Sequence, residues 1–194
     1  MRWAGYLALW AGFGATHSLL AGARGREGLA RWAGAGDRLV YNLIALVELG
    51  VVLGYARAVL PAIPFAEPPA LRVARWGAMA AGALVLARGG RGYDLARFAG
   101  LAQLRSGPEA AAAAEKLVVG GWNAWVRHPL YLGLLLFVWG MVGDARAAVT
   151  AGCVTAYVLI GIHFEERKLL RLHGADYAAY RARVPMLLPW RGRR

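Results

Sequence analysis

The sequence predicts an all-α fold, a polytopic bundle of about five transmembrane helices with a cytoplasmic C-terminal helix. Two observations carry this prediction. Hydrophobic residues make up 59% of the 194 residues and charged residues only 18%, whereas about a quarter of the residues of a soluble domain are charged. The charges also cluster between long apolar stretches, which is typical of membrane proteins with short loops. We therefore expect one membrane domain over residues 1–194, with the lipid bilayer as its surroundings.

Five apolar segments are expected to form the spans. They are approximately Trp3–Leu20, Leu39–Leu60, Val73–Ala87, Leu130–Val142 and Ala147–Ile162. A helix needs roughly 20 apolar residues to cross the hydrocarbon core, so the last three are short. Residues 1–22 also resemble a cleavable signal peptide, because Arg2 precedes the apolar run and Ala21-Gly22-Ala23 follows it. Cleavage would leave four spans, which fit the basic loops less well.

The distribution of arginine and lysine predicts the orientation of the chain. Basic residues concentrate between the first and second segments, between the third and fourth, and after the fifth. The connection 61–69 contains none. The positive-inside rule places all three basic stretches in the cytoplasm only if the number of spans is odd. We therefore expect an N-terminus outside and a C-terminus inside the inner (cell) membrane of a bacterium.

The net charge of +12 does not indicate a nucleic-acid partner. Arginines lie between apolar runs and form no basic stripe on a soluble domain, so we expect no nucleic-acid binding.

The single Cys153 excludes a disulfide within the chain and a cysteine-based metal site, and we expect no metal. In the long third connection, Ser106 and Glu109 form a capping box that predicts a short helix over 109–116.

The stretch Arg127-His128-Pro129 predicts the start of a helix with charged groups at its N-terminus. Proline is favoured at the first helical position, where its missing N–H costs little. The free N–H groups and the dipole of such a helix start favour an anion, such as the carboxylate of an amino-acid-like ligand. The alternative is that Arg127 anchors the helix end and His128 caps it.

Two further stretches follow the fifth apolar segment. Glu165 and Glu166 could bind hydroxyls or an ammonium group of a ligand, or could pair locally with Arg167 and Lys168 on the helix surface. Tyr177 and Tyr180 are three residues apart and share a helix face. That helix must end before Pro185. Aromatic residues in such a position are also typical of packing at the membrane interface.

In their order and spacing, these motifs resemble the isoprenylcysteine carboxyl methyltransferase and phospholipid methyltransferase superfamily. The resemblance covers about residues 117–190 and implies a cofactor-binding core with S-adenosyl-L-methionine in a cytoplasm-facing pocket. It departs from the family pattern at Asn123, where the family often has tyrosine. The resemblance implies catalytic roles for Arg127 and His128, which would orient the methionine moiety. The positions implied to bind the cofactor are His128, Pro129, Tyr131, Glu165, Glu166, Tyr177 and Tyr180.

The N-terminal half, residues 1–88, looks similar to the branch of methanethiol S-methyltransferases and NnrU-type proteins associated with denitrification. This resemblance implies that the N-terminal helices contact a small or lipophilic methyl acceptor, such as a thiol, an isoprenylcysteine-like carboxylate or a lipid. The implied acceptor-binding residues are His17, Tyr41, Asn42 and Asp94. Glu48 is a further ionisable residue within an expected span, where such groups either carry function or bond a neighbouring helix.

The sequence thus favours a membrane methyltransferase that uses S-adenosylmethionine. Two alternatives stay open. One is an NnrU-like protein that assists denitrification without methyl transfer, and the other is an NADPH-dependent reductase of the sterol type. The ligand that raises the thermal stability of the protein distinguishes them.

Overall fold

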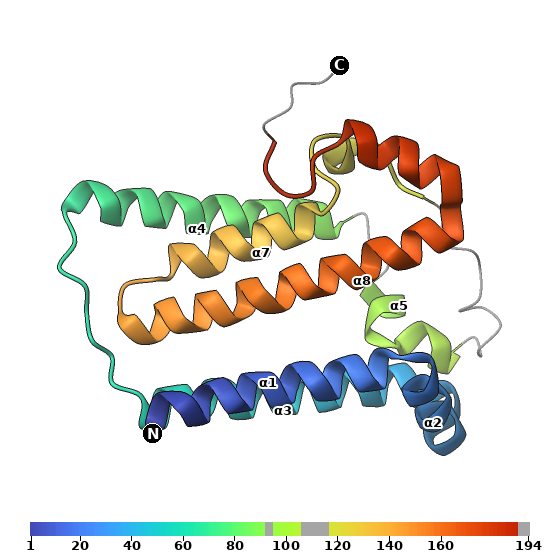
Figure 1. Cartoon of the computed structure of the whole chain (residues 1–194), viewed down its shortest axis with the longest axis horizontal. Helices are drawn as coiled ribbons and strands as arrows, with labels where there is room; N and C mark the ends of the chain where they lie inside the picture. Colours follow the sequence, from blue (N-terminus) through green and yellow to red (C-terminus); the bar gives the residue numbers. More distant parts are fainter. Residues whose placement is uncertain (92–94, 106–116, 190–194) are drawn as a thin grey trace. The chain divides into compact units, whose positions relative to one another are not determined.

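The computed structural model describes residues 1–91, 95–105 and 117–189, and these residues form helices and no β-strand (Figure 1). The predicted all-α fold class is confirmed. The chain divides into two compact units. Unit 1 comprises Met1–Pro61 and Tyr93–Ala114, and unit 2 comprises Ala62–Gly92 and Glu115–Arg194. The division into residues 1–88 and 117–190 that the sequence suggested stays a prediction. The helix expected over 109–116 lies outside the described residues.

Unit 1 is built on two long helices, α1 (Arg2–Ala21) and α3 (Asp37–Val59), which lie side by side and antiparallel (Figure 1). At one end of the pair the Tyr55 hydroxyl donates to the Arg2 carbonyl oxygen over 3.1 Å. At the other end Tyr41 and His17 share a hydrogen bond. The interior of the pair contains an aromatic series on α1 in which Tyr6 is fully buried and Trp10 is 8% exposed.

The stretch between the first two apolar segments was expected to be a basic loop, but most of it is helical. It forms α2 (Ala23–Ala33) and the short 3₁₀ helix η1 (Gly34–Gly36). The reason is an amphipathic pattern: Arg24, Glu27 and Arg31 share one helix face, while Leu29 and Trp32 lie on another. Unit 1 also contains α5 (Leu95–Ala99).

Unit 2 contains α4 (Pro69–Gly90), the 3₁₀ turn η2 (Gly121–Ala124), α7 (Pro129–Gly140) and α8 (Ala145–Arg183). Glycines allow α4 and α7 to approach closely. A Cβ atom at Gly82 would stand 2.6 Å from the Gly133 carbonyl oxygen, and one at Gly140 would stand 2.7 Å from the Arg75 carbonyl oxygen. Small residues at a helix interface allow close packing of backbones in membranes, where no hydrophobic force drives helices together.

Helix α8 continues well beyond the predicted fifth segment and changes direction at Gly174. This glycine has φ 49° and ψ −120°, a conformation with positive φ that other residues rarely adopt. The chain then continues as a second helical piece that ends at Arg183. The predicted end of the helix before Pro185 is confirmed, because Val184 has an extended backbone. The reversal is visible at the red end of the ribbon in Figure 1.

Each of the five predicted apolar segments lies on a helix, namely α1, α3, α4, α7 and α8. In the described part of the chain, three helical stretches are long and apolar enough to cross a membrane: Ala23–Val59, Pro69–Gly90 and Ala145–Arg183. Helix α7 is apolar but has only 12 residues. The total of five spans stays a prediction.

An ion pair closes the end of unit 2 where α7 ends and α8 begins. Glu67 binds Arg75 through both oxygens, Arg75 Nε to Oε2 over 2.8 Å and Nη2 to Oε1 over 2.5 Å. The Nη1 group of Arg75 donates to the Gly140 carbonyl oxygen over 3.0 Å. The hydrogen bond from Arg75 holds the pKa of the Glu67 carboxyl below its ordinary value. We call Glu67, Arg75 and the Gly140 carbonyl the loop-end clasp.

Candidate functional site

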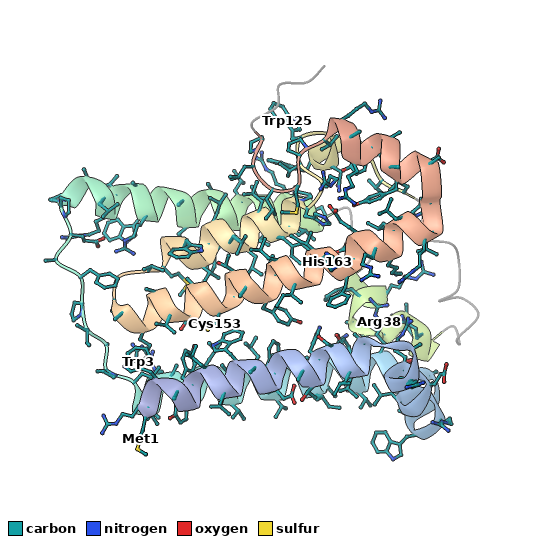
Figure 2. All side chains as sticks on the ribbon, viewed as in Figure 1. Met1, Trp3, Arg38, Trp125, Cys153 and His163 are labelled. Atoms are coloured by element: carbon teal, nitrogen blue, oxygen red, sulfur yellow. The ribbon has the colours of Figure 1, made fainter. Side chains whose placement is uncertain are left out.

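Three segments that are far apart in the sequence meet at the start of α7. They are the residues just before Pro129, the part of α8 around Glu166, and the extended segment after Arg183. Figure 2 shows this region of unit 2 on the side of the labelled Trp125. We call the cluster formed by Arg127, His128, Glu166, Tyr177 and Tyr180 the Glu166 cluster. It combines five of the residues that the sequence singled out.

The Glu166 carboxylate is the centre of this cluster and is 7% exposed. Its Oε1 atom accepts from Arg127 Nε over 2.7 Å and forms an ion pair with Arg127 Nη2 at 2.6 Å. Both side chains are 9% exposed. The second oxygen, Oε2, lies 3.6 Å from Nε of Arg181. A buried carboxylate with this degree of pairing stays ionised, since the guanidinium offsets the cost of its burial.

His128 lies against the same carboxylate. Its Nε2 atom is 3.2 Å from Glu166 Oε1, and its Nδ1 atom is 3.9 Å from Glu165 Oε2. His128 precedes α7 as its N-cap residue, but its side chain makes no capping hydrogen bond. The capping alternative for His128 therefore does not describe this structure. The ring joins α7 to α8 instead.

The two adjacent glutamates have different surroundings. The Glu165 side chain is 42% exposed and the Glu166 side chain only 9%. The local pairs of Glu166 with Arg167 and Lys168 were one reading of the sequence. In the structure Glu166 pairs with Arg127, which is 39 residues away along the chain. Glu165 is therefore the member of the pair that water or a ligand reaches more readily.

Arg127 also binds the segment that follows α8. Its Nη1 group donates to the carbonyl oxygen of Val184 over 2.5 Å and to that of Arg181 over 3.3 Å. Two backbone hydrogen bonds run beside this contact. The Arg127 N–H donates to the Pro185 carbonyl over 2.9 Å, and the His128 N–H donates to the Met186 carbonyl over 3.2 Å. The guanidinium of Arg127 thus bonds to protein groups through all three of its nitrogen atoms.

The helical piece after Gly174 brings Tyr177 and Tyr180 to the cluster. Their ring centroids are 5.9 Å apart, so the predicted shared face is confirmed. The Tyr180 hydroxyl donates to the Asn123 carbonyl over 2.7 Å. Tyr177 is 1% exposed, and its hydroxyl makes no hydrogen bond within the described part of the chain. A buried hydroxyl without a partner is costly, which makes it a candidate for bonding a ligand.

The remaining predicted cofactor positions lie at the start of α7. Pro129 is the first residue of the helix, as the sequence predicted, and it is also buried. Tyr131 packs against the cluster of Val158, Ile162 and Leu187, and its ring lies 5.6 Å from that of His128. These contacts fix the orientation of the helix start, where the first N–H groups have no partner within the helix.

The predicted acceptor-binding residues belong to unit 1. His17 and Tyr41 are hydrogen-bonded to each other, and their rings are 4.8 Å apart. Asn42 instead donates to the Phe98 carbonyl over 2.9 Å, which ties α3 to α5. Asp94 lies outside the described residues. Glu48 has one carboxylate oxygen that is buried and makes no hydrogen bond in the described part of the chain.

Sequence reasoning missed two contributors to the Glu166 cluster. Asn123 was noted only as a departure from the family pattern. Its side chain donates to the Arg127 carbonyl over 3.1 Å, and its own carbonyl accepts from Tyr180. Arg181 lies beside Glu166 and was treated as one of many tail arginines. No signal in the sequence distinguishes Arg181 from the other arginines near the C-terminus. Asn123 does have a signal, because an asparagine three residues after Gly120 is typical of a turn.

Among the residues that the structure describes, no group of three or more histidine, cysteine, aspartate or glutamate side chains has the arrangement of a metal site. The Glu166 cluster instead combines one buried carboxylate, cationic groups and aromatic hydroxyls. Chemically, such a set can bind and orient a polar ligand that carries both charges and hydroxyl groups.

Comparisons with known proteins were consistent in pointing to one group. The model of the family described as "NnrU protein" matches residues 6–189. A methanethiol S-methyltransferase of Mycobacterium tuberculosis is 31% identical over 92% of this chain and 74% of its own length. Methanethiol S-methyltransferase 2 of Bradyrhizobium diazoefficiens is 50% identical, but the match covers 33% of this chain and 25% of the relative. Methanethiol S-methyltransferase 1 of the same organism is 44% identical over 34% of this chain and 24% of the relative. No solved structure matches the chain.

Proposed function

The chain belongs to the NnrU protein family, and we propose that it is a membrane methyltransferase that uses S-adenosyl-L-methionine to methylate a small thiol. The observation that carries this proposal is the Glu166 cluster, with its ion-paired buried carboxylate and the buried Tyr177 hydroxyl that has no partner among the described residues. The names of the relatives supply the reaction class. We further propose the bacterial inner membrane as its location, with the C-terminus in the cytoplasm.

The chemistry of the cluster fits S-adenosylmethionine. The cofactor carries an amino acid group, ribose hydroxyls and a cationic sulfur. The Glu165 carboxylate is half-exposed and suits an ammonium or hydroxyl group. The Tyr177 hydroxyl offers a donor and an acceptor, and the rings of Tyr131 and Tyr177 suit a cation nearby. The free N–H groups of the first turn of α7 favour a carboxylate.

When bound, S-adenosylmethionine would supply the methyl group for transfer from its sulfonium to the sulfur of a thiolate, with S-adenosylhomocysteine as the other product. Arg127 and His128 hold Glu166 in place and fix the start of α7. Because the Arg127 nitrogen atoms all bond to protein groups, we assign Arg127 a positioning role. The burial of Glu166, His128 and Tyr177 keeps water away from this part of the cluster.

We propose that the acceptor is a small thiol, and that His17, Tyr41, Asn42 and Asp94 contribute to its binding. The support for these four residues is the resemblance of the N-terminal half to methanethiol S-methyltransferases. His17 and Tyr41 are the strongest candidates among the four, because a hydrogen-bonded pair of ionisable side chains between two apolar helices, α1 and α3, is unusual.

The test measures methyl transfer by membranes that contain the full-length protein. Membranes receive methyl-labelled S-adenosylmethionine and methanethiol, and labelled dimethyl sulfide is collected from the headspace. We expect product with the wild type and at least a hundredfold less with Glu166→Gln. Asp176→Asn is the matched control, since this exposed carboxylate is adjacent to Tyr177. It should retain wild-type activity.

Binding of the cofactor is measured separately, by titration calorimetry of purified protein in lipid nanodiscs. A folded protein that neither binds S-adenosylmethionine nor methylates any thiol would contradict the proposal. In that case a non-enzymatic role would be favoured, and co-purification of a partner protein would support it. Stabilisation by NADPH in place of S-adenosylmethionine would favour the reductase.

A further inference from the structure

One end of the α1–α3 pair in unit 1 carries a concentration of exposed arginines. Arg24, Arg26 and Arg31 lie on α2, and Arg105 lies in the helical residues 101–105; all four are exposed. The only acidic residue on α2 is Glu27. We call these four arginines, together with the exposed apolar side chains described next, the basic collar.

Large apolar side chains are exposed among these arginines. Trp32 on α2 is 78% exposed, Leu19 at the end of α1 is 73% exposed, and Phe98 on α5 is 63% exposed. Leu104 is 49% exposed. Exposed apolar surface next to cationic groups is typical of helices that lie in the interface of a membrane, with apolar side chains among the lipids and arginines at the headgroups.

The collar is held together by contacts within unit 1. Arg38 at the start of α3 donates to the Phe98 carbonyl over 3.1 Å, and its guanidinium lies 5.9 Å from the centre of the Phe98 ring (Figure 2). Gly100, with φ 90°, approaches so closely that a Cβ there would stand 2.6 Å from the Leu39 backbone nitrogen. These contacts hold α5 at the same end of α3 as η1 and α2.

The direction of α2 supports a position along a surface. Helix α1 ends at Ala21, and Gly22 has an extended backbone that separates it from α2. Helix α2 then turns across the end of the α1–α3 pair (Figure 1). None of its residues is buried. Arg24, Glu27 and Arg31 lie on one face of α2, Leu29 and Trp32 lie on another, and Arg26 lies at the border of the apolar face. A helix with this pattern and no buried residue suits a boundary between water and an apolar phase.

We propose that the basic collar is a docking surface for anionic phospholipids, with α2 lying in the headgroup layer of the membrane. The four arginines pair with phosphate groups of the lipids, and Trp32, Leu19 and Phe98 insert among the upper parts of the chains. Charge complementarity carries the choice of partner, because among the described residues of α2, the start of α3 and residues 101–105 the five arginines outnumber the two acidic residues, Glu27 and Asp37. A juxtamembrane basic segment of this kind is attracted by a negatively charged leaflet.

The first experiment places full-length protein in nanodiscs of phosphatidylcholine alone or with 30% phosphatidylglycerol and records the melting temperature. We expect phosphatidylglycerol to raise the melting temperature of the wild type. The variant Arg24→Gln/Arg26→Gln/Arg31→Gln should lose more than half of this rise. The matched control is Arg2→Gln/Arg57→Gln, which alters two exposed arginines at the other end of the α1–α3 pair. It should keep most of the rise.

A second measurement remains informative if the triple variant is poorly folded. A spin label is attached at Trp32→Cys in a Cys153→Ser background, and its accessibility to oxygen and to a water-soluble nickel complex is compared. We expect oxygen to dominate, as for a position within the bilayer. A label accessible mainly to nickel, or an equal loss of the lipid effect in both arginine variants, would overturn the proposal. The proposal would also be overturned if short DNA raised the melting temperature as much as phosphatidylglycerol does.

Discussion

Unit 2 contains two arginine–glutamate pairs of similar design at opposite ends of α7. In the loop-end clasp, Arg75 binds Glu67 and the carbonyl of Gly140. In the Glu166 cluster, Arg127 binds Glu166 and the carbonyl of Val184. Each guanidinium thus joins a carboxylate to a backbone carbonyl, and so connects segments that are distant in the sequence.

The difference lies in what surrounds each pair. Around Glu67 the contacts are those of loop closure: Phe65 N–H donates to the Gly143 carbonyl, and Ala145 N–H donates to the Ile63 carbonyl. Around Glu166 there are a histidine, a second glutamate and a buried tyrosine hydroxyl without a partner in the described residues. Two ion pairs of similar geometry therefore have different roles, one in closing a loop and the other in forming the candidate site. The pair that lies beside an unsatisfied buried group is the candidate for ligand binding.

The largest effect is expected from removal of the buried arginine. Arg127→Met leaves the Glu166 carboxylate buried with weaker pairing, which typically costs about 3–5 kcal/mol in the free energy of unfolding. The measurement is equilibrium unfolding in mixed micelles. Arg75→Met at the loop-end clasp is the comparison. We expect a smaller loss there because the Arg75 and Glu67 side chains are 18% and 12% exposed, whereas those of Arg127 and Glu166 are both 9% exposed. Equal losses would remove the distinction between the two ends.

Tyr177→Phe tests whether the buried hydroxyl serves a ligand. We expect affinity for S-adenosylmethionine to fall about tenfold, which corresponds to roughly 1.4 kcal/mol. The stability of the protein without cofactor should be unchanged or higher, since the removed hydroxyl has no partner in the described part of the chain. Titration calorimetry and thermal unfolding measure the two quantities. A loss of stability with unchanged affinity would make Tyr177 a structural residue.

Tyr180→Phe should give the opposite pattern. Its hydroxyl donates to the Asn123 carbonyl, so its loss should lower the free energy of unfolding by about 1 kcal/mol. The affinity for cofactor should change less than in Tyr177→Phe. Because the two tyrosines are three residues apart on one face, each variant serves as the control for the other. Titration calorimetry measures the affinity and thermal unfolding measures the stability, as for Tyr177→Phe.

The smallest effect concerns Glu67 and depends on pH. The pKa of Glu67 is lowered in the folded protein, so its contribution to stability is present above its ordinary value of 4.5 and is lost as pH falls through the folded value. The wild type should exceed Glu67→Gln in melting temperature at pH 7, and the difference should shrink below pH 4.5. Methyl transfer per folded molecule should stay the same. A difference that does not change with pH would contradict this account.

Much of the helical architecture was predictable because its signals are local. The apolar segments lie on helices, Pro129 begins α7, and the helix of Tyr177 and Tyr180 ends before Pro185. Each of these features depends on residues within a few positions of one another. The amphipathic helix α2 was missed, because its short length and many arginines resembled a loop.

The partners within the site were less predictable. Sequence spacing suggested that Glu166 pairs with Arg167 or Lys168, since these residues are close on the helix surface. The actual partner is 39 residues away, and its position depends on the reversal at Gly174 and on the segment after Arg183. No periodic pattern reports such a contact. The role of Asn123 was missed for the same reason, because its partner Tyr180 is 57 residues further along the chain.

The backbone hydrogen bonds from Arg127 and His128 to Pro185 and Met186 have a consequence for biogenesis. During synthesis, α4 and α7 can pack as soon as they have left the ribosome, but these bonds must wait until residue 186 has emerged. The end of unit 2 that carries the Glu166 cluster is therefore completed last. A chain that ends before Val184 should already hold its glycine-packed helices, but it lacks the hydrogen bonds from Arg127 and His128 to residues 184–186. The packed helices therefore form before the proposed cofactor site is complete.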